Sequence, residues 1–426
     1  SRHRMPNLVA TLRTTARDHS ERTAIRSGST AISFAELLAA AGRFGQRLRA
    51  DGVTVGDRVA LAMPNIPRFA VAYYGTLLAG GVAVPLNPAH PGAVLAARLV
   101  DARPRLLVVA HGPPAAVLRA ATSAGVRLCE LTDAAEDAEQ TEEIEEIDAE
   151  PVRDDAPAVI AYKATHLEET TGVVLSHHNL AWSAAAAAGV LGLTAGDTLA
   201  THFPLCQPLG QTYGLTAAVA AGCALALPTV DAASPLHVVE SSQATVLSTF
   251  PLLIGAATSD NAPSVATVPP TLRTVFCSGG RNLAPRVRDR LATRLDCEVL
   301  EGYGIPETSA LGCSVRSGEA PAPGSMGRAV PGVELAVVDG RGRETVARRA
   351  GGLVARGPNV MAGYWERPRD TARAFSNGWL LTGEKVRRDE DGNIYLLDNV
   401  WWTDPLRGRE SGREGLFRRG LRRLRG

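Results

Sequence analysis

The chain has 426 residues, of which 45% are hydrophobic and 21% are charged, and its formal net charge is +1. A globular chain of this length can bury a sizeable core in two or three compact units. The nearly neutral charge gives no reason to expect nucleic acid or another acidic partner.

Cysteine spacing and apolar runs bear on the cellular location. The six cysteines form no CxxC pair and no Cys/His cluster with metal-ligand spacing, so we expect reduced thiols rather than disulfides or a zinc site. Residues 1–20 lack the apolar core of a signal peptide, and no segment approaches the roughly 20 apolar residues that span a bilayer. We therefore expect a cytoplasmic protein without a membrane span.

The first part of the chain alternates short apolar runs with amphipathic stretches. Ser33 and Glu36 have the spacing of a helix capping box, and apolar residues then recur on one helical face, which predicts a helix over 33–50. Alternation of strands and helices is typical of mainly parallel sheets covered by helices, so we expect two α/β subdomains. Strands are expected at 59–63, 82–85 and 106–110, and a further helix near 69–79.

Composition changes mark the later boundaries. Residues 133–150 are strongly acidic and nearly free of large apolar side chains, which predicts a solvated loop or surface helix. The α/β pattern resumes at Ala158 with strands near Val246 and Val275, and Gly and Pro then break 324–364 into the short strands of a small β-barrel-like subdomain. The predicted units are paired α/β subdomains over 1–310, a β-rich subdomain over 311–398 and a tail over 399–426.

The tail is rich in Arg and Gly and is too short to fold alone. It is either a disordered end or a short basic amphipathic helix, with Leu416, Phe417, Leu421 and Leu424 against an anionic membrane or partner. A shifted reading frame or a truncated gene would also produce such an end from GC-rich DNA.

Six separated motifs carry a family resemblance. They are GDRVALAMPN at 56–65, VVLSHHNL at 173–180, SGG at 278–280, EGYGIPET at 301–308, GLVARGPNVMAGYWERP at 352–368 and GWLLTGE at 378–384. Together they resemble the acyl-CoA synthetase branch of the adenylate-forming superfamily that also contains luciferases and nonribosomal-peptide adenylation domains. The resemblance extends from about Arg22 to Asp398.

The resemblance implies the large N-terminal domain of such enzymes and their two-step reaction. A carboxylate and ATP form an acyl adenylate with release of pyrophosphate, and the acyl group then passes to a thiol. The implied ligands are ATP or AMP and Mg²⁺, without a prosthetic group. The implied partners are a hydrophobic acyl substrate or acyl thioester, and CoA or a carrier protein.

The phosphate-binding loop departs from the family pattern. Between Tyr162 and Gly172, where the family has a Gly/Ser/Thr-rich loop with a lysine, the sequence is KATHLEETT, and Thr171 stands at the usual lysine position. Glu168 and Glu169 would repel triphosphate oxygens, so normal ATP binding is expected to be poor. The loop is either a decayed exposed segment or a new polar site built from Lys163, His166, Glu168 and Glu169.

The nucleotide end of the implied site is better preserved. Gly279 and Gly280 allow close approach of a ring, and Tyr303 and Gly304 supply an aromatic surface and a tight turn beside adenine. The remaining nucleotide positions implied by the resemblance are Glu307 as the magnesium ligand, preceded by Pro306 instead of a threonine, and Glu384, which replaces the aspartate that binds the ribose hydroxyls.

The implied acyl pocket lies between two apolar segments without charge, 204–214 and 277–280. Its candidate residues are Gln207, which replaces a histidine usual in the family, Gly210, Gly214 and Ser278. Ordinary core packing would explain the same segments equally well.

Beyond Asp398 the family continues with an arginine and a hinge into a mobile C-terminal domain, and we expect both to be missing here. Three hypotheses follow. The chain is a ligase homologue that is impaired in adenylation or completed by a partner protein, a non-catalytic protein that binds an acyl group, nucleotide or carrier protein, or a repurposed acyl-transfer or condensation enzyme of a biosynthetic pathway that uses Lys163, His166 or Glu168.

Overall fold

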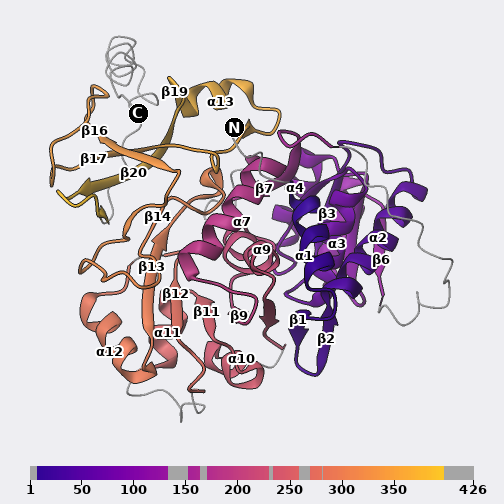
Figure 1. The fold of residues 1–426 in the computed structure, drawn as a ribbon. Helices are drawn as coiled ribbons and strands as arrows, with labels where there is room; N and C mark the ends of the chain where they lie inside the picture. The colour runs from indigo at the N-terminus through magenta and orange to yellow at the C-terminus, as the bar shows by residue number, and fades with distance from the viewer. Residues whose placement is uncertain are drawn as a thin grey trace.

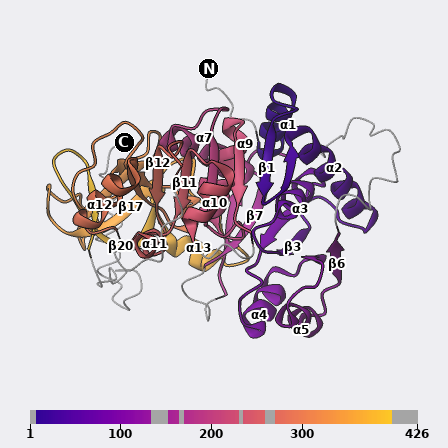
Figure 2. The same ribbon diagram turned by 90° about the horizontal axis from the view of Figure 1, so that it is seen from below.

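The computed structural model describes residues 7–132, 152–163, 170–229, 234–258, 269–280 and 282–397. Within these residues, three β-sheets and their helices form a layered α/β arrangement (Figure 1). The N-terminal elements, drawn in indigo, lie at the opposite end from the C-terminal sheet, drawn in orange and yellow, and the view from below shows the same separation (Figure 2). None of the described helices combines the length and apolar character needed to cross a membrane.

The first sheet has seven strands. Their order is β18 (Gly363–Tyr364), β8 (Gly172–Ser176), β7 (Pro157–Tyr162), β4 (Val82–Pro85), β3 (Arg58–Ala62), β5 (Leu106–Ala110) and β6 (Leu128–Leu131). Strands β7, β4, β3, β5 and β6 pair in parallel, whereas β7 with β8 and β8 with β18 are antiparallel. Strands β4 and β5 are continuous apolar runs because both faces of the sheet are covered there, whereas the edge strand β6 contains Glu130.

The second sheet has nine strands. Their order is β15 (Arg328–Ala329), β14 (Cys313–Ser314), β13 (Glu298–Tyr303), β12 (Thr274–Cys277), β11 (Val246–Thr249), β9 (Thr198–Thr201), β10 (Ala224–Leu227), β1 (Thr23–Ser27) and β2 (Thr30–Ser33). The strands from β13 to β1 pair in parallel, and antiparallel pairs form both edges.

The third sheet is small and antiparallel. It contains β16 (Glu334–Val338), β17 (Gly351–Arg356), β20 (Trp379–Arg388), β19 (Phe375–Ser376) and β21 (Ile394–Leu396). Strands β14 and β15 belong instead to the nine-stranded sheet, and β18 belongs to the seven-stranded one. The predicted domain limits therefore stay a prediction, although a small β-rich unit does occupy this part of the chain.

Helices fill the space between the two large sheets and cover their outer faces. The inner layer contains α1 (Leu8–Asp18), α2 (Phe34–Ala50), α3 (Pro67–Leu78), α7 (His177–Leu191) and α9 (Ala217–Ala221), which share one apolar core with both sheets. Two outer helices, α4 (Gly92–Ala102) and α5 (Ala115–Ala124), cover the seven-stranded sheet. Three others, α10 (Pro235–Ser242), α11 (Pro251–Ala257) and α12 (Pro285–Leu295), cover the nine-stranded sheet.

The predicted α/β class with mainly parallel sheets is confirmed. The predicted helix over 33–50 is α2, and the runs at 82–85 and 106–110 are β4 and β5. Sequence periodicity succeeds here because each element buries one uninterrupted apolar face or run. The acidic stretch 133–150 and the tail 399–426 lie outside the described residues.

The capping box of α2 provides a first test of local stability. The Ser33 hydroxyl accepts from the Glu36 amide at 3.1 Å, and the Glu36 carboxylate accepts from the Ser33 amide at 2.6 Å. Replacing Ser33 with alanine is expected to lower the free energy of unfolding by about 1 kcal/mol, because it leaves helix amides unsatisfied. Urea unfolding of both proteins measures this, and equal midpoints would contradict the assigned cap.

Candidate functional site

Lys163, Glu307 and Tyr364 meet where the two large sheets approach each other. Lys163 follows β7, Glu307 lies in the short 3₁₀ helix η2 (Pro306–Thr308), and Tyr364 ends β18. The Lys163 Nζ atom is 2.5 Å from Glu307 Oε1, and the Tyr364 hydroxyl donates to the same oxygen at 2.8 Å. The side chain of Glu307 is only 4% exposed, so these two donors hold a buried carboxylate.

A hydrogen-bonded loop fixes η2 in this position. The Met361 amide donates to the Glu307 carbonyl at 2.8 Å, and Asn359, which is fully buried, donates to the Thr308 carbonyl at 3.1 Å. Ser309, which has φ of 52°, donates from its hydroxyl to the Asn359 carbonyl at 2.9 Å. These bonds compensate for the unusual backbone at Ser309 and keep Glu307 facing Lys163.

Tyr303 and Glu384 form the neighbouring part of the cluster. Tyr303 ends β13, and Glu384 lies in β20 of the small sheet. Burial raises the pKa of Tyr303, and the nearby Glu384 carboxyl adds to the rise. The pKa of Glu384 is also raised by burial, and the nearby Glu307 carboxyl adds to the rise. The fold thus joins a residue of the predicted adenine surface with the predicted ribose ligand.

Both ends of the rewritten loop are tied to α4. Arg98 donates to the Lys163 carbonyl at 2.7 Å, and Arg367 donates to the Thr170 carbonyl at 2.6 Å. Asp101 accepts from Arg367 at 3.1 Å and from the Tyr162 hydroxyl at 2.6 Å. The antiparallel register also pairs Tyr162 with Gly172.

Three further residues belong to the predicted polar site of the loop. His166 and Glu168 lie outside the described residues, as does Glu169. Their suggested role in a new polar site stays a prediction. The described ends of the loop nevertheless fix its length and its attachment.

The predicted nucleotide glycines have different surroundings. A Cβ on Gly304 would lie 2.0 Å from the Ala310 carbonyl carbon, so a side chain at this turn would meet backbone. Gly279 has φ of 79° and faces Leu209 and Phe250, whereas a Cβ on Gly280 would meet nothing within 4 Å. Packing alone explains why positions 304 and 279 require glycine, but it gives no reason for glycine at position 280.

The predicted acyl residues lie among tightly packed core side chains. Gln207 precedes α8 (Pro208–Gly210), and a Cβ on Gly210 would lie 2.2 Å from the Pro204 carbonyl oxygen. The Ser278 hydroxyl donates to the Gly302 carbonyl at 2.9 Å. Gly210 and Ser278 therefore have structural roles, and the acyl pocket stays a prediction.

A π-helix lies beside these residues. This segment, η1 (Gln211–Thr216), contains Gly214 and the fully buried Tyr213, whose ring stacks on Phe276 with centroids 4.2 Å apart. Single π turns inside helices are frequent at functional sites, which makes η1 relevant to the candidate site. The sequence analysis did not predict it. The aromatic stack fills the apolar space between η1 and β12.

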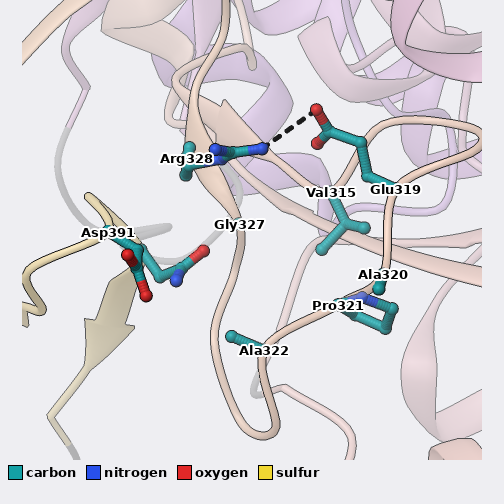
Figure 3. A pocket seen from close by; sticks show the side chains of 9 residues that line it. Val315, Glu319, Ala320, Pro321, Ala322, Gly327, Arg328 and Asp391 are labelled. Carbon is teal, nitrogen blue, oxygen red and sulfur yellow. Dashed lines mark hydrogen bonds and ion pairs between the residues drawn. The ribbon is translucent and has the colours of Figure 1, made fainter.

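A separate polar pocket of about 360 Å³ opens between residues 315–328 and the β20–β21 hairpin (Figure 3). Glu319 and Arg328 project toward each other at its edge and form an ion pair of 3.1 Å. Asp391 and Asn393, from the β20–β21 hairpin, also line the pocket. The pocket shares no residue with the predicted nucleotide or acyl positions.

Sequence reasoning missed Tyr364, Asn359 and Arg367 as parts of this arrangement. All three belong to the segment 352–368, which the sequence analysis identified only as a motif. No local sequence pattern indicates the position of Tyr364, because the pairing of β18 with β8 brings this motif to the end of the rewritten loop.

Comparisons with known proteins agree with the arrangement. Residues 12–365 match a family described as AMP-binding enzyme. A feruloyl-CoA synthase from Amycolatopsis is 30% identical over 389 residues, which cover 89% of this chain and 75% of that protein.

Two solved structures share the fold. The ATP-bound structure of MatB from Rhodopseudomonas palustris has a TM-score of 0.82 and 27% identity, and the match covers 92% of this chain and 78% of that one. An N-terminal domain of FACL13 from Mycobacterium tuberculosis has a TM-score of 0.81 and 24% identity, and the match covers 93% of this chain and all of that domain.

Proposed function

The chain belongs to the AMP-binding enzyme family of adenylate-forming ligases, and from this premise we propose that it is a ligase homologue impaired in forming the adenylate. The carrying observation is the segment between Tyr162 and Gly172, which the β7–β8 register fixes at both ends. It contains no glycine, and Thr171 stands at the position where the family resemblance calls for lysine.

The two half-reactions make different demands on the protein. In the first, a carboxylate oxygen bonds to the α-phosphorus of ATP while the bond to the bridging oxygen of pyrophosphate breaks. Negative charge then develops on the leaving group, and loop amides and a lysine stabilise it. In the second, a thiol attacks the acyl carbonyl and AMP leaves, which requires no contact with pyrophosphate.

The proposed site is an adenylate site for a hydrophobic or aromatic acid. Its nucleotide end consists of Gly279, Gly280, Tyr303, Gly304 and Glu384. The likeness to a feruloyl-CoA synthase supports an acyl or aryl acid and CoA as the class of substrates. The proposed acyl end consists of Gln207, Gly210, Gly214 and Ser278.

The other two functions receive less support. A repurposed acyl-transfer or condensation site needs Lys163 free to react, but Glu307 already binds its ammonium. That hypothesis therefore rests on His166 and Glu168. A purely binding protein for acyl groups, nucleotides or carrier proteins differs from the proposal only in lacking thioester formation.

Isotope exchange between pyrophosphate and ATP tests the proposal. With a panel of aliphatic and aromatic acids, exchange is expected to be at least about 100-fold slower than in an intact ligase of the family, because the charge-stabilising loop is lost. Synthetic benzoyl-AMP should still bind and be consumed by CoA. Exchange at the rate of the intact ligase would contradict the impairment, whereas benzoyl-AMP binding without consumption would favour the binding protein.

A further inference from the structure

The Glu307 carboxylate is already occupied by an internal cation. It stands where the family resemblance puts the magnesium ligand, yet its Oε1 atom receives both the Lys163 ammonium at 2.5 Å and the Tyr364 hydroxyl at 2.8 Å. Mg²⁺ requires oxygen ligands near 2.0 to 2.1 Å in an octahedron, and the ammonium in contact with Oε1 occupies the position that a metal ion on that oxygen would take. The residues present therefore do not fit magnesium.

Lysine is a rare choice in this sequence. Among its 45 basic residues, Lys163 and Lys385 are the only lysines, and all others are arginines. A lysine ammonium is a compact point charge, whereas an arginine guanidinium is a wide planar group. Of the two, Lys163 is the one placed on the buried carboxylate, with its ammonium 5.8 Å from the centre of the Tyr364 ring.

Other positive charges near the loop have partners of their own. Arg98 donates to the Lys163 carbonyl, and Arg367 is bound to the Thr170 carbonyl and to Asp101. Lys163 is thus the basic side chain of the described loop ends that reaches the carboxylate cluster. Because Lys163 and Glu307 form a pair without net charge, Glu307 does not repel the phosphate of an adenosine monophosphate ester as an unpaired carboxylate would, but the pair offers no net positive charge to the triphosphate of ATP.

We propose that Lys163 takes the place of the divalent cation at Glu307, so that this site binds an adenosine monophosphate ester without metal and in preference to ATP. The inference rests on the proposed function, because it concerns the same nucleotide site. It further specifies that site by naming the ligand class and by removing the requirement for Mg²⁺.

Calorimetry of AMP and ATP, each in EDTA and in excess Mg²⁺, tests this with the unaltered protein. We expect AMP affinity to change less than about twofold between the two conditions and ATP to bind at least about tenfold more weakly than AMP. AMP affinity that rises tenfold or more with Mg²⁺ would contradict this inference alone. If neither nucleotide binds in either condition, both the inference and the proposed nucleotide site are wrong.

A matched pair of lysine variants tests whether the Lys163 ammonium is responsible for AMP binding without metal. Lys163→Met is expected to weaken AMP binding in EDTA by about tenfold or more, since charge-assisted bonds contribute about 1.5–3 kcal/mol, and Mg²⁺ should restore part of the loss. Lys385→Met removes the chain's other lysine, which lies in β20 opposite Gly352 of β17, and should leave AMP affinity unchanged. Equal effects of both variants would contradict a specific role of Lys163.

Paramagnetic resonance of Mn²⁺ provides a readout that needs no nucleotide. The unaltered protein should leave Mn²⁺ free, whereas Lys163→Met should bind it at the vacated Glu307 carboxylate. Tight Mn²⁺ binding by the unaltered protein that is lost in Glu307→Gln would overturn the inference. Because this arm uses the unaltered protein, it remains decisive even if Lys163→Met fails to fold.

Discussion

Replacing Gly304 with alanine is expected to lower the free energy of unfolding by about 3 kcal/mol or more. Its Cβ would lie 2.0 Å from the Ala310 carbonyl carbon and 2.3 Å from the Leu311 nitrogen, both of which are backbone atoms that no rotamer change can move. Overpacking normally costs about 1–3 kcal/mol, and a clash with backbone belongs at or above the upper end. Urea unfolding followed by circular dichroism measures the loss.

Gly280 supplies the matched control for this substitution. It belongs to the same predicted nucleotide end, but a Cβ there meets nothing within 4 Å. Gly280→Ala is therefore expected to change stability by less than about 0.5 kcal/mol. If it reduces AMP binding while stability is unchanged, Gly280 lies against the ligand; equal stability losses in both variants would contradict the packing argument.

Replacing Glu301 with glutamine is expected to stabilise the protein by about 3 kcal/mol at pH 8 and by little at pH 4.5. Glu301 is buried in β13, where its carboxylate accepts from the Leu283 amide at 2.7 Å, and burial raises its pKa from 4.5 to about 7. A folded-state pKa above the unfolded one means that stability falls as pH rises from 4.5 to 7. This pKa difference between the folded and unfolded states lowers the free energy of unfolding by about 3 kcal/mol at high pH. Glutamine keeps the hydrogen-bond acceptor for the Leu283 amide but carries no charge.

Two buried histidines make the stability of the protein rise with pH in the acidic range, which is the opposite of the effect of Glu301. Burial lowers the pKa values of His177 and His202 to about 4, below the usual 6.5. The unfolded chain therefore binds more protons between pH 6.5 and 4, and stability falls as pH drops through that window. The unaltered protein should be most stable near pH 6.5, whereas Glu301→Gln should stay stable at higher pH.

Urea unfolding from pH 4.5 to 8.5 measures these slopes. Glu334→Gln is the control, because the surface Glu334 is paired with Arg356 and its pKa is lowered by that hydrogen bond. It should show no gain at pH 8. Parallel pH profiles for the unaltered protein and Glu301→Gln would contradict a buried carboxylate that titrates near neutrality.

The fold was accessible from sequence because its signals are local. Ser33 and Glu36 set the start of α2, and uninterrupted apolar runs produced β4 and β5. The resemblance to adenylate-forming enzymes, inferred from six short motifs, is confirmed by the family match over residues 12–365. Each of these signals depends on residues that are close in sequence.

The candidate site could be predicted only in part, because its contacts join residues that are far apart in the sequence. Lys163 and Glu307 were both singled out, but in separate roles, one in a new polar site and the other as a metal ligand. Their contact depends on η2 lying beside β8 and on Tyr364 arriving through β18, which no local pattern encodes. The predicted ligand roles of the glycines stay predictions, and the structure adds a packing reason for one of them, since a Cβ on Gly210 would lie 2.2 Å from the Pro204 carbonyl oxygen.

The pairing of β18 with β8 also constrains how the protein is made. Residues 363–364 complete a sheet whose other strands all lie before residue 177, with Gly363 opposite Val174. At a synthesis rate of roughly 5–20 residues per second, β18 is made on the order of ten to forty seconds after β8. During this time the backbone N–H and C=O groups on that edge of β8 have no strand to pair with. An unpaired strand edge invites aggregation, so chains released before Tyr364 should depend on chaperones far more than longer ones.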